Sequence, residues 1–120
     1  MTARILDGNE VAGIVRAEVA EAVSALPYTP GLATILVGDD PASHVYVRGK
    51  RRDAEEVGFA SIHHELSATA AQSELEALID GLNGDPDVDG ILLQLPLPGG
   101  LDSEAAVERI DPAKDVDGLH

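Results

Sequence analysis

Residues 32–41, LATILVGDDP, place an uninterrupted apolar run directly before two acidic residues and a proline. An apolar run of this length, bounded by turn residues, is typical of a buried strand in a parallel sheet. Asp40 followed by proline is a favoured helix start, because the carboxylate accepts from unpaired backbone N–H groups and proline fits the first turn. The pattern predicts a buried strand over 32–37 and then a helix that continues to Gly58, a residue type common just after a helix.

A helix is also expected before this strand. Apolar residues recur at helical spacing from Val11 to Leu26. Asp7 or Asn9 can cap the first turn, and Pro27 ends the pattern.

Two further strands are expected after Gly58, because apolar residues gather over 59–66 and over 88–95 between turn signals. Between these strands, Thr69 with Gln72 three residues later resembles a capping box at the start of a helix.

A last helix is expected from a cap at Asp102 or Ser103 through Ile110, followed by a tail with turn chemistry. Helices that alternate with apolar strands favour an α/β domain of three layers, in which helices flank a largely parallel sheet. The sequence contains no internal repeat, linker or low-complexity segment.

The chain has 120 residues, of which 22 are acidic and 8 are basic, so its formal charge is −14. A domain this acidic repels phosphate backbones and anionic lipid surfaces, which argues against nucleic-acid and membrane partners. The absence of cysteine excludes disulfides and thiolate chemistry. No apolar run approaches a membrane span and residues 1–9 lack the apolar core of a signal peptide, so a cytoplasmic protein is expected.

The basic residues are concentrated: four of the eight lie between Arg48 and Arg52. These side chains either form a solvated helix face, balanced by nearby acidic residues, or contact an anionic ligand. The sequence leaves the two alternatives open. The four basic residues are Arg48, Lys50, Arg51 and Arg52.

Within the second predicted helix, Ser43, Tyr46 and Lys50 share one face with the apolar residues Ala54 and Val57. A lysine on such a half-buried face loses hydration of its charged form, so the amine becomes available as a proton carrier. The alternative is a lysine whose stem merely covers its helix.

Gln94 is the only polar side chain in residues 91–95, just before a strand ends. Ligands of open α/β sheets gather at the carboxyl ends of strands, so Gln94 could face a ligand. Alternatively, its amide could satisfy the backbone of the turn at 96–100.

Asp115 and Asp117 lie in the terminal loop, where carboxylates most often cap turns. His63 and His64 are adjacent and therefore point to opposite faces of a strand, while His44 and His120 are isolated. No metal site is expected. The chain also lacks the glycine-rich patterns that bind dinucleotides and triphosphates.

Three motifs together resemble the bifunctional methylenetetrahydrofolate dehydrogenase/methenyltetrahydrofolate cyclohydrolase family. They are VGDDPASHVYVRGK at 37–50, GILLQLPLP at 90–98 and DVDG at 115–118, and they occur in the family's order. The resemblance covers nearly all of the chain, including Asp7-Gly8 near its start.

The resemblance implies roles for the candidate residues. Lys50 would be the catalytic lysine, and Tyr46 would pack against the aromatic body of the folate. Gln94 would hydrogen-bond Lys50 and hold it in its working state. Asp117 would accept two hydrogen bonds from the pterin ring. Ser43 would support the lysine and the substrate.

The resemblance also implies an activity. Members oxidise 5,10-methylenetetrahydrofolate with NADP and hydrolyse the resulting methenyl cation to 10-formyltetrahydrofolate. Residues 1–120 would be the N-terminal catalytic, folate-binding domain, with NADP bound by a C-terminal Rossmann domain that is absent from this sequence. Residues 1–120 by themselves would then transfer no hydride. The parent enzyme is expected to be a homodimer.

Two other function classes remain as alternatives. A phosphoacceptor signalling domain is similarly long and acidic, and Asp39-Asp40 would supply its paired aspartates after the first strand. That class also needs an aspartate at the end of the third strand, where this chain has Gln94. The second alternative is a non-catalytic module that binds folate or dimerises.

Overall fold

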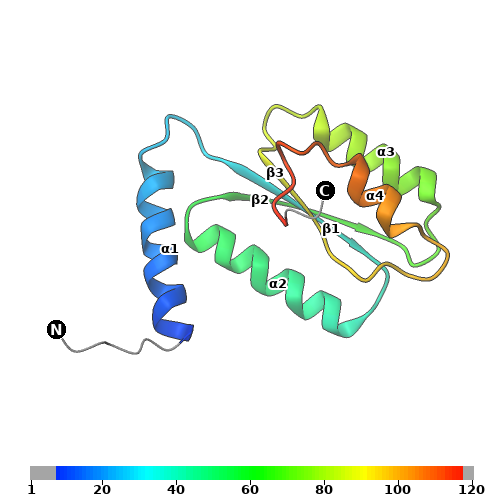
Figure 1. Cartoon of the computed structure of the whole chain (residues 1–120), viewed down its shortest axis with the longest axis horizontal. Coiled ribbons are helices and arrows are strands. Elements are labelled where there is room, and N and C mark those ends of the chain that lie inside the picture. Colours follow the sequence, from blue (N-terminus) through cyan, green and yellow to red (C-terminus); the bar gives the residue numbers. More distant parts are fainter. Residues whose placement is uncertain (1–7, 118–120) are drawn as a thin grey trace.

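The computed structural model describes residues 8–117, with side chains described from residue 15 onward. Three parallel strands form one sheet in the order β2-β1-β3, and helices cover both of its faces (Figure 1). This confirms the predicted three-layer α/β domain. The elements are α1 (Gly8–Ser24), β1 (Gly31–Val37), α2 (Pro41–Glu56), β2 (Ala60–Leu66), α3 (Gln72–Asn83), β3 (Gly90–Leu93) and α4 (Ser103–Arg109).

The central strand β1 is buried on both faces, as its continuous apolar sequence predicts. Its alternate residues divide between two layers. One set, with Ala33 and Ile35, packs under α3 and α4 as part of the main core. The other set, with Thr34 and Leu36, faces α2. The main core consists of Ala33, Ile35, Val37, Leu75, Ile79, Leu82, Val88, Ile91, Leu93, Ala106 and Ile110.

Helix α2 begins and ends where the sequence predicts. The Asp40 carboxylate accepts from the backbone N–H groups of Ala42 at 2.9 Å and Ser43 at 3.4 Å. Pro41 occupies the first turn. At the other end Gly58 follows the C-cap with a φ of +100°, a left-handed conformation that favours glycine. The Asp40 cap therefore starts α2 shortly after the end of β1, and the helix then packs across the sheet.

Two local predictions were wrong. Thr69 does not cap α3: its hydroxyl pairs with Ser67 at 2.9 Å, and the helix starts at Gln72 without a side-chain cap. The Gln72 side chain instead pairs with the backbone of Asp102. The third strand is also shorter than predicted, because the Val88 N–H donates to a carbonyl in the preceding turn, and Pro96 lacks an N–H to extend the ladder.

Helix α1 lies at one end of the molecule, beyond the sheet (Figure 1). Its predicted extent is confirmed. Of its apolar side chains, Val15 is 50 % exposed and Val19 and Val23 are half-buried, and Leu26, just past the helix end, is 41 % exposed. Asn9 lies inside the helix rather than capping it, and Asp7 lies outside the described residues. None of the helices in the described part of the chain is long and apolar enough to cross a membrane.

Candidate functional site

A lysine and a glutamine from two elements meet beside the edge strand β3. Lys50 Nζ, from the middle of α2, donates a hydrogen bond to Gln94 Oε1 at 3.1 Å. Gln94 directly follows β3, at the carboxyl end of the strand. The expected contact between these two side chains is confirmed. It lies at the end of the parallel strands where ligands of open α/β sheets bind.

The amide of Gln94 is held from several sides. Its side chain is buried, with 7 % of the residue exposed. Its Nε2 donates to the carbonyl oxygen of Leu95 at 2.8 Å, and its backbone N–H donates to Ile35 at 3.0 Å. One end of the amide therefore satisfies a backbone carbonyl at Leu95, just before the turn, and the other end faces Lys50. The acceptor is neutral, so Lys50 can keep this hydrogen bond with or without its positive charge.

Lys50 and Tyr46 are more exposed than the helical spacing predicts. Ser43 is 2 % exposed and Val47 is also buried, but Tyr46 is 59 % exposed and Lys50 is exposed. Of the two alternatives for Lys50, the half-buried lysine is wrong. Helix α2 packs mainly on β1 and β2, and its Lys50 side chain reaches Gln94 at the margin beside β3. Tyr46 and Lys50, one helical turn apart, are open to a ligand at that margin.

Asp117 reaches the same edge of the sheet by another route. After α4 the chain forms a parallel bridge between Asp115 and Ile91 of β3. It therefore runs in the direction of β3, and Asp117 follows the bridge towards the end at which Gln94 lies. Asp117 is exposed, and its backbone N–H donates to Asp115 Oδ1 at 3.3 Å. Asp115 caps the turn, which leaves Asp117 as the candidate ligand of the pair.

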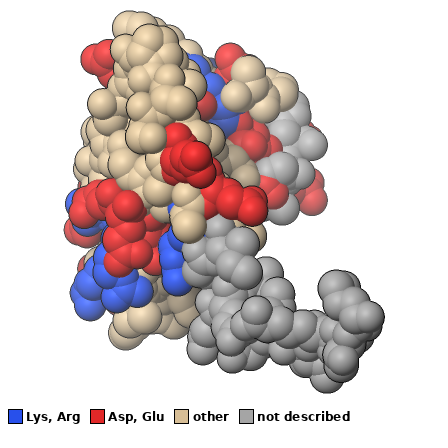
Figure 2. Space-filling model, turned by 90° about the vertical axis from the view of Figure 1, so that its left-hand side faces the viewer, with Lys and Arg blue, Asp and Glu red and all other residues tan. Residues whose placement is uncertain are grey.

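The arginines beside Lys50 do not act as one group. Arg51 Nε donates to Ser61 Oγ of β2 at 3.2 Å, so this side chain lies across the sheet face under α2. Arg48 and Arg52 are exposed. On the face shown in Figure 2, basic side chains lie among acidic ones. The surface shown therefore carries mixed charge around its basic groups.

His63 takes part in a polar network that sequence analysis did not anticipate. Its Nδ1 lies 2.7 Å from Thr34 Oγ1, and its Nε2 lies 3.0 Å from Glu65 Oε1. The hydrogen bond from His63 lowers the pKa of Glu65. Thr34 meets His63 only once β1 and β2 pair in register, so no local sequence pattern marks this contact; Glu65 lies two residues after His63 on the same strand. Within residues 15–117 no group of three or more histidine and carboxylate side chains could hold a metal ion.

Asp39 and Asp40 do not form a phosphoacceptor site. The Asp40 carboxylate is engaged in capping α2. The position at the end of the third strand is Gln94, whose amide is bound to Lys50 and to the backbone. The signalling-domain alternative therefore lacks its acceptor among the described residues.

The fold and this site define a domain of the parallel α/β class with a positioned amine at the carboxyl end of its strands, the usual place of a small-molecule site in such folds. The chain belongs to the family described as tetrahydrofolate dehydrogenase/cyclohydrolase, catalytic domain, whose model matches residues 6–117.

Individual relatives agree with this assignment. The chain is 61 % identical over 120 residues to the bifunctional protein FolD of Acidiphilium cryptum, which covers all of this chain and 43 % of that protein. The crystal structure of the bifunctional FolD methylenetetrahydrofolate dehydrogenase/cyclohydrolase from Campylobacter jejuni has a TM-score of 0.91 at 41 % identity, covering 95 % of this chain and 42 % of that one.

A second structure, the Trypanosoma brucei methylenetetrahydrofolate dehydrogenase-cyclohydrolase complexed with NADP cofactor and inhibitor, has a TM-score of 0.89 at 38 % identity. The match covers 98 % of this chain and 41 % of that one. The chain thus spans about two fifths of the length of these relatives.

Proposed function

We propose that this chain is the folate-binding catalytic domain of an enzyme with two linked activities. The enzyme oxidises 5,10-methylenetetrahydrofolate to the methenyl cation with NADP and hydrolyses that cation to 10-formyltetrahydrofolate. The observation that carries the proposal is the hydrogen bond between Lys50 Nζ and Gln94 Oε1, in a chain of this family. Lys50 is exposed at this margin of the sheet, where a planar substrate has access to its amine, and Gln94 is buried behind it.

Hydrolysis requires a group that first accepts and then delivers a proton. Water adds to the methenyl carbon, so a C–O bond forms and the water loses a proton. A C–N bond then breaks, and the released ring nitrogen gains a proton. One of the two water protons ends on that nitrogen and the other is released. A single amine at Lys50 can accept the first proton and return it to the nitrogen.

Gln94 gives that amine its position. Because the amide is buried and bound to Leu95, Oε1 offers one fixed acceptor to a flexible lysine side chain. One N–H of Lys50 is thereby oriented, and the rest of the amine remains directed to the substrate side. Fixing a reactive group in this way removes part of the entropy cost of reaching the transition state.

The remaining proposed contacts surround this pair. The exposed ring of Tyr46 packs against the aromatic part of the folate, one helical turn from Lys50. The Asp117 carboxylate accepts two hydrogen bonds from the donor edge of the pterin ring. Buried Ser43 supports the start of α2 beneath the substrate.

The N-termini of α2 and α4 do not fit the pyrophosphate of NADP. Helix N-termini bind phosphate through free backbone N–H groups. At α2 the N–H groups of Ala42 and Ser43 point to the Asp40 carboxylate, and at α4 the N–H of Ala105 points to Asp102. A carboxylate at each position repels a phosphate. As part of the proposal, NADP is bound by residues other than those described here.

The proposal also includes a cytoplasmic location and a homodimeric enzyme. The net charge of −14 supports a protein that does not bind nucleic acid or anionic membranes. Tetrahydrofolate derivatives are the proposed small-molecule partners.

The test is the variant Lys50→Ala in the full-length enzyme. Loss of the proton carrier should lower the rate of methenyltetrahydrofolate hydrolysis by a factor of about 100 or more. Binding of the folate substrate should remain within about threefold of wild type, because Tyr46 and Asp117 still hold it. The rate is followed by absorbance of the methenyl cation and the affinity by calorimetry.

Arg16→Ala is the matched control, since it removes an exposed positive charge from α1. It should leave both the rate and the affinity unchanged. Hydrolysis by Lys50→Ala at the wild-type rate would contradict the assignment of Lys50. Wild-type protein that binds folate without turnover would instead support the non-catalytic module.

A further inference from the structure

The chain between α4 and Asp117 is held to the end of α3 by two side chains, Asn83 and Lys114, which we call the α3 clamp. Asn83 is the last residue of α3, and Lys114 lies three residues before Asp117. Neither residue contacts the Lys50–Gln94 pair. Their contacts nevertheless determine where the chain returns to the sheet.

Lys114 points its ammonium group into the end of α3. Its Nζ donates to the carbonyl oxygens of Leu82 at 3.2 Å, Asn83 at 2.9 Å and Asp85 at 3.0 Å. These three bonds use all three ammonium hydrogens. The last carbonyl groups of a helix lack partners within the helix and carry its partial negative charge. A lysine in this place therefore stabilises the helix end and fixes its own backbone.

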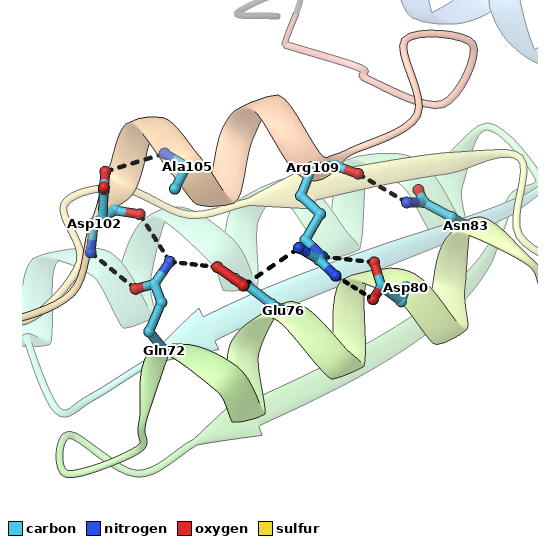
Figure 3. A network of polar contacts seen from close by, with 7 residues as sticks. All are labelled: Gln72, Glu76, Asp80, Asn83, Asp102, Ala105 and Arg109. Atoms are coloured by element: carbon cyan, nitrogen blue, oxygen red, sulfur yellow. Dashed lines mark hydrogen bonds and ion pairs between the residues drawn. The ribbon is translucent and has the colours of Figure 1, made fainter.

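Asn83 holds the same segment from the opposite direction. Its Nδ2 donates to the carbonyl oxygen of Arg109 at 2.8 Å, and its Oδ1 accepts from the backbone N–H of Asp111 at 2.9 Å. Figure 3 shows the first of these contacts beside the ion pairs of Arg109. One amide thus bridges the end of α4 and the start of the following segment.

The clamp leads directly to the edge of the sheet. The backbone carbonyl of Lys114 accepts from the N–H of Ile91 at 2.7 Å, and the N–H of Val116 donates to the carbonyl of Ile91 at 3.5 Å. The residue that anchors α3 through its side chain therefore pairs with β3 through its backbone. Asp117 is three residues after Lys114 and directly follows Val116. Because Lys114 and Val116 are both bonded to Ile91, the backbone leading to Asp117 has little freedom.

We propose that Lys114, with Asn83, is a positioning residue that sets where Asp117 meets the folate pterin ring. This inference rests on the proposed function, because it assigns a purpose to the location of a proposed substrate contact. Lys114 acts through Asp117 and does not touch the substrate. The proposal identifies the end of α3, on the far side of the sheet from α2, as part of the substrate-binding apparatus.

The test compares Lys114→Met with Arg109→Met in the full-length enzyme. Both variants remove a cation held by α3, but the guanidinium of Arg109 binds the carboxylates of exposed Asp80 and half-buried Glu76. Lys114→Met should displace Asp117, so a charged hydrogen bond from Asp117 to the folate substrate is lost. KM for that substrate should therefore rise about tenfold with kcat nearly unchanged. Arg109→Met should leave KM unchanged.

A double-mutant cycle with Asp117→Asn separates positioning from general destabilisation. Once Asp117 no longer binds the ring, Lys114→Met should have no further effect on KM. Additive effects of the two substitutions, or an equal rise of KM in Arg109→Met, would overturn the proposal. If Lys114→Met does not fold, Asn83→Ala removes two of the clamp bonds and carries the same expectation.

Amide hydrogen exchange provides a readout that does not depend on folate. Lys114→Met should accelerate exchange at Ile91 and Val116 about tenfold, whereas Arg109→Met should not. A wild-type enzyme without folate binding would refute the proposed function but would leave this readout intact. Unchanged exchange at both amides would overturn the clamp itself.

Discussion

Replacing Gln94 by leucine tests whether this buried amide positions the lysine. The two side chains have similar volume, so Gln94→Leu removes polar atoms with little change in packing. The variant loses the acceptor for Lys50 at 3.1 Å and the donor to the Leu95 carbonyl at 2.8 Å. The backbone bond to Ile35 remains, because it does not involve the side chain.

The expected effects on stability and on rate differ in size. An unsatisfied carbonyl costs roughly 1–3 kcal/mol, partly offset by the added apolar contact, so the net loss of unfolding free energy should be about 1 kcal/mol. A hydrogen bond to a charged group is worth about 1.5–3 kcal/mol, so the hydrolysis rate should fall roughly 10- to 100-fold. Urea denaturation and methenyltetrahydrofolate hydrolysis, measured on the same preparations, give both numbers.

Thr34→Val is the matched control for this prediction. It removes a part-buried hydrogen bond between Thr34 and His63 on the same face of the sheet and leaves the partner of Lys50 in place. We expect a similar loss of stability with an unchanged rate. The reasoning is refuted if Gln94→Leu loses stability without losing rate, or if both variants lose rate equally.

Two further predictions concern stability. A Cβ at Gly31 would overlap the backbone carbonyl oxygen of Asp87, so Gly31→Ala should cost about 3 kcal/mol of unfolding free energy in urea. A Cβ at Gly49 in α2 would meet only open space, so Gly49→Ala should stabilise by about 0.5–1 kcal/mol. The Arg109 guanidinium holds the pKa of Asp80 below its usual value. The stabilisation of the folded state by this ion pair is present above the pKa of an unfolded aspartate and is lost as pH falls through the lowered pKa of Asp80. Thermal melts of wild type and Asp80→Asn should therefore converge towards strongly acidic pH, and a difference that persists there would contradict the assignment.

The sequence predicted most of the architecture because the signals were local. Asp40 and Asp102 cap α2 and α4 as expected, and Gly58 ends its helix in the predicted conformation. Such signals depend on a few neighbouring residues, so they survive in the folded chain. Thr69 failed as a cap: its hydroxyl pairs with Ser67, and the Gln72 side chain binds backbone groups of Asp102, far away in the sequence.

The site was only partly predictable because several of its contacts join segments that are far apart in the sequence. The pairing of Lys50 with Gln94 could be expected, but the exposure of Lys50 depends on β3 being an edge strand, which no local pattern indicates. The clamp by Lys114 and the network around His63 join segments about 30 residues apart in sequence. These contacts appear only when the strands and helices are assembled.

Chemical rescue of Lys50→Ala tests the central claim most directly, because it separates proton transfer from positive charge. Methylamine supplies an N–H proton and a charge, whereas tetramethylammonium supplies the charge alone. After subtraction of the rate without protein, methylamine should raise methenyltetrahydrofolate hydrolysis by Lys50→Ala in proportion to its concentration, and tetramethylammonium should not. Equal rescue by both cations, or no rescue by methylamine, would contradict the role of Lys50 as the proton carrier.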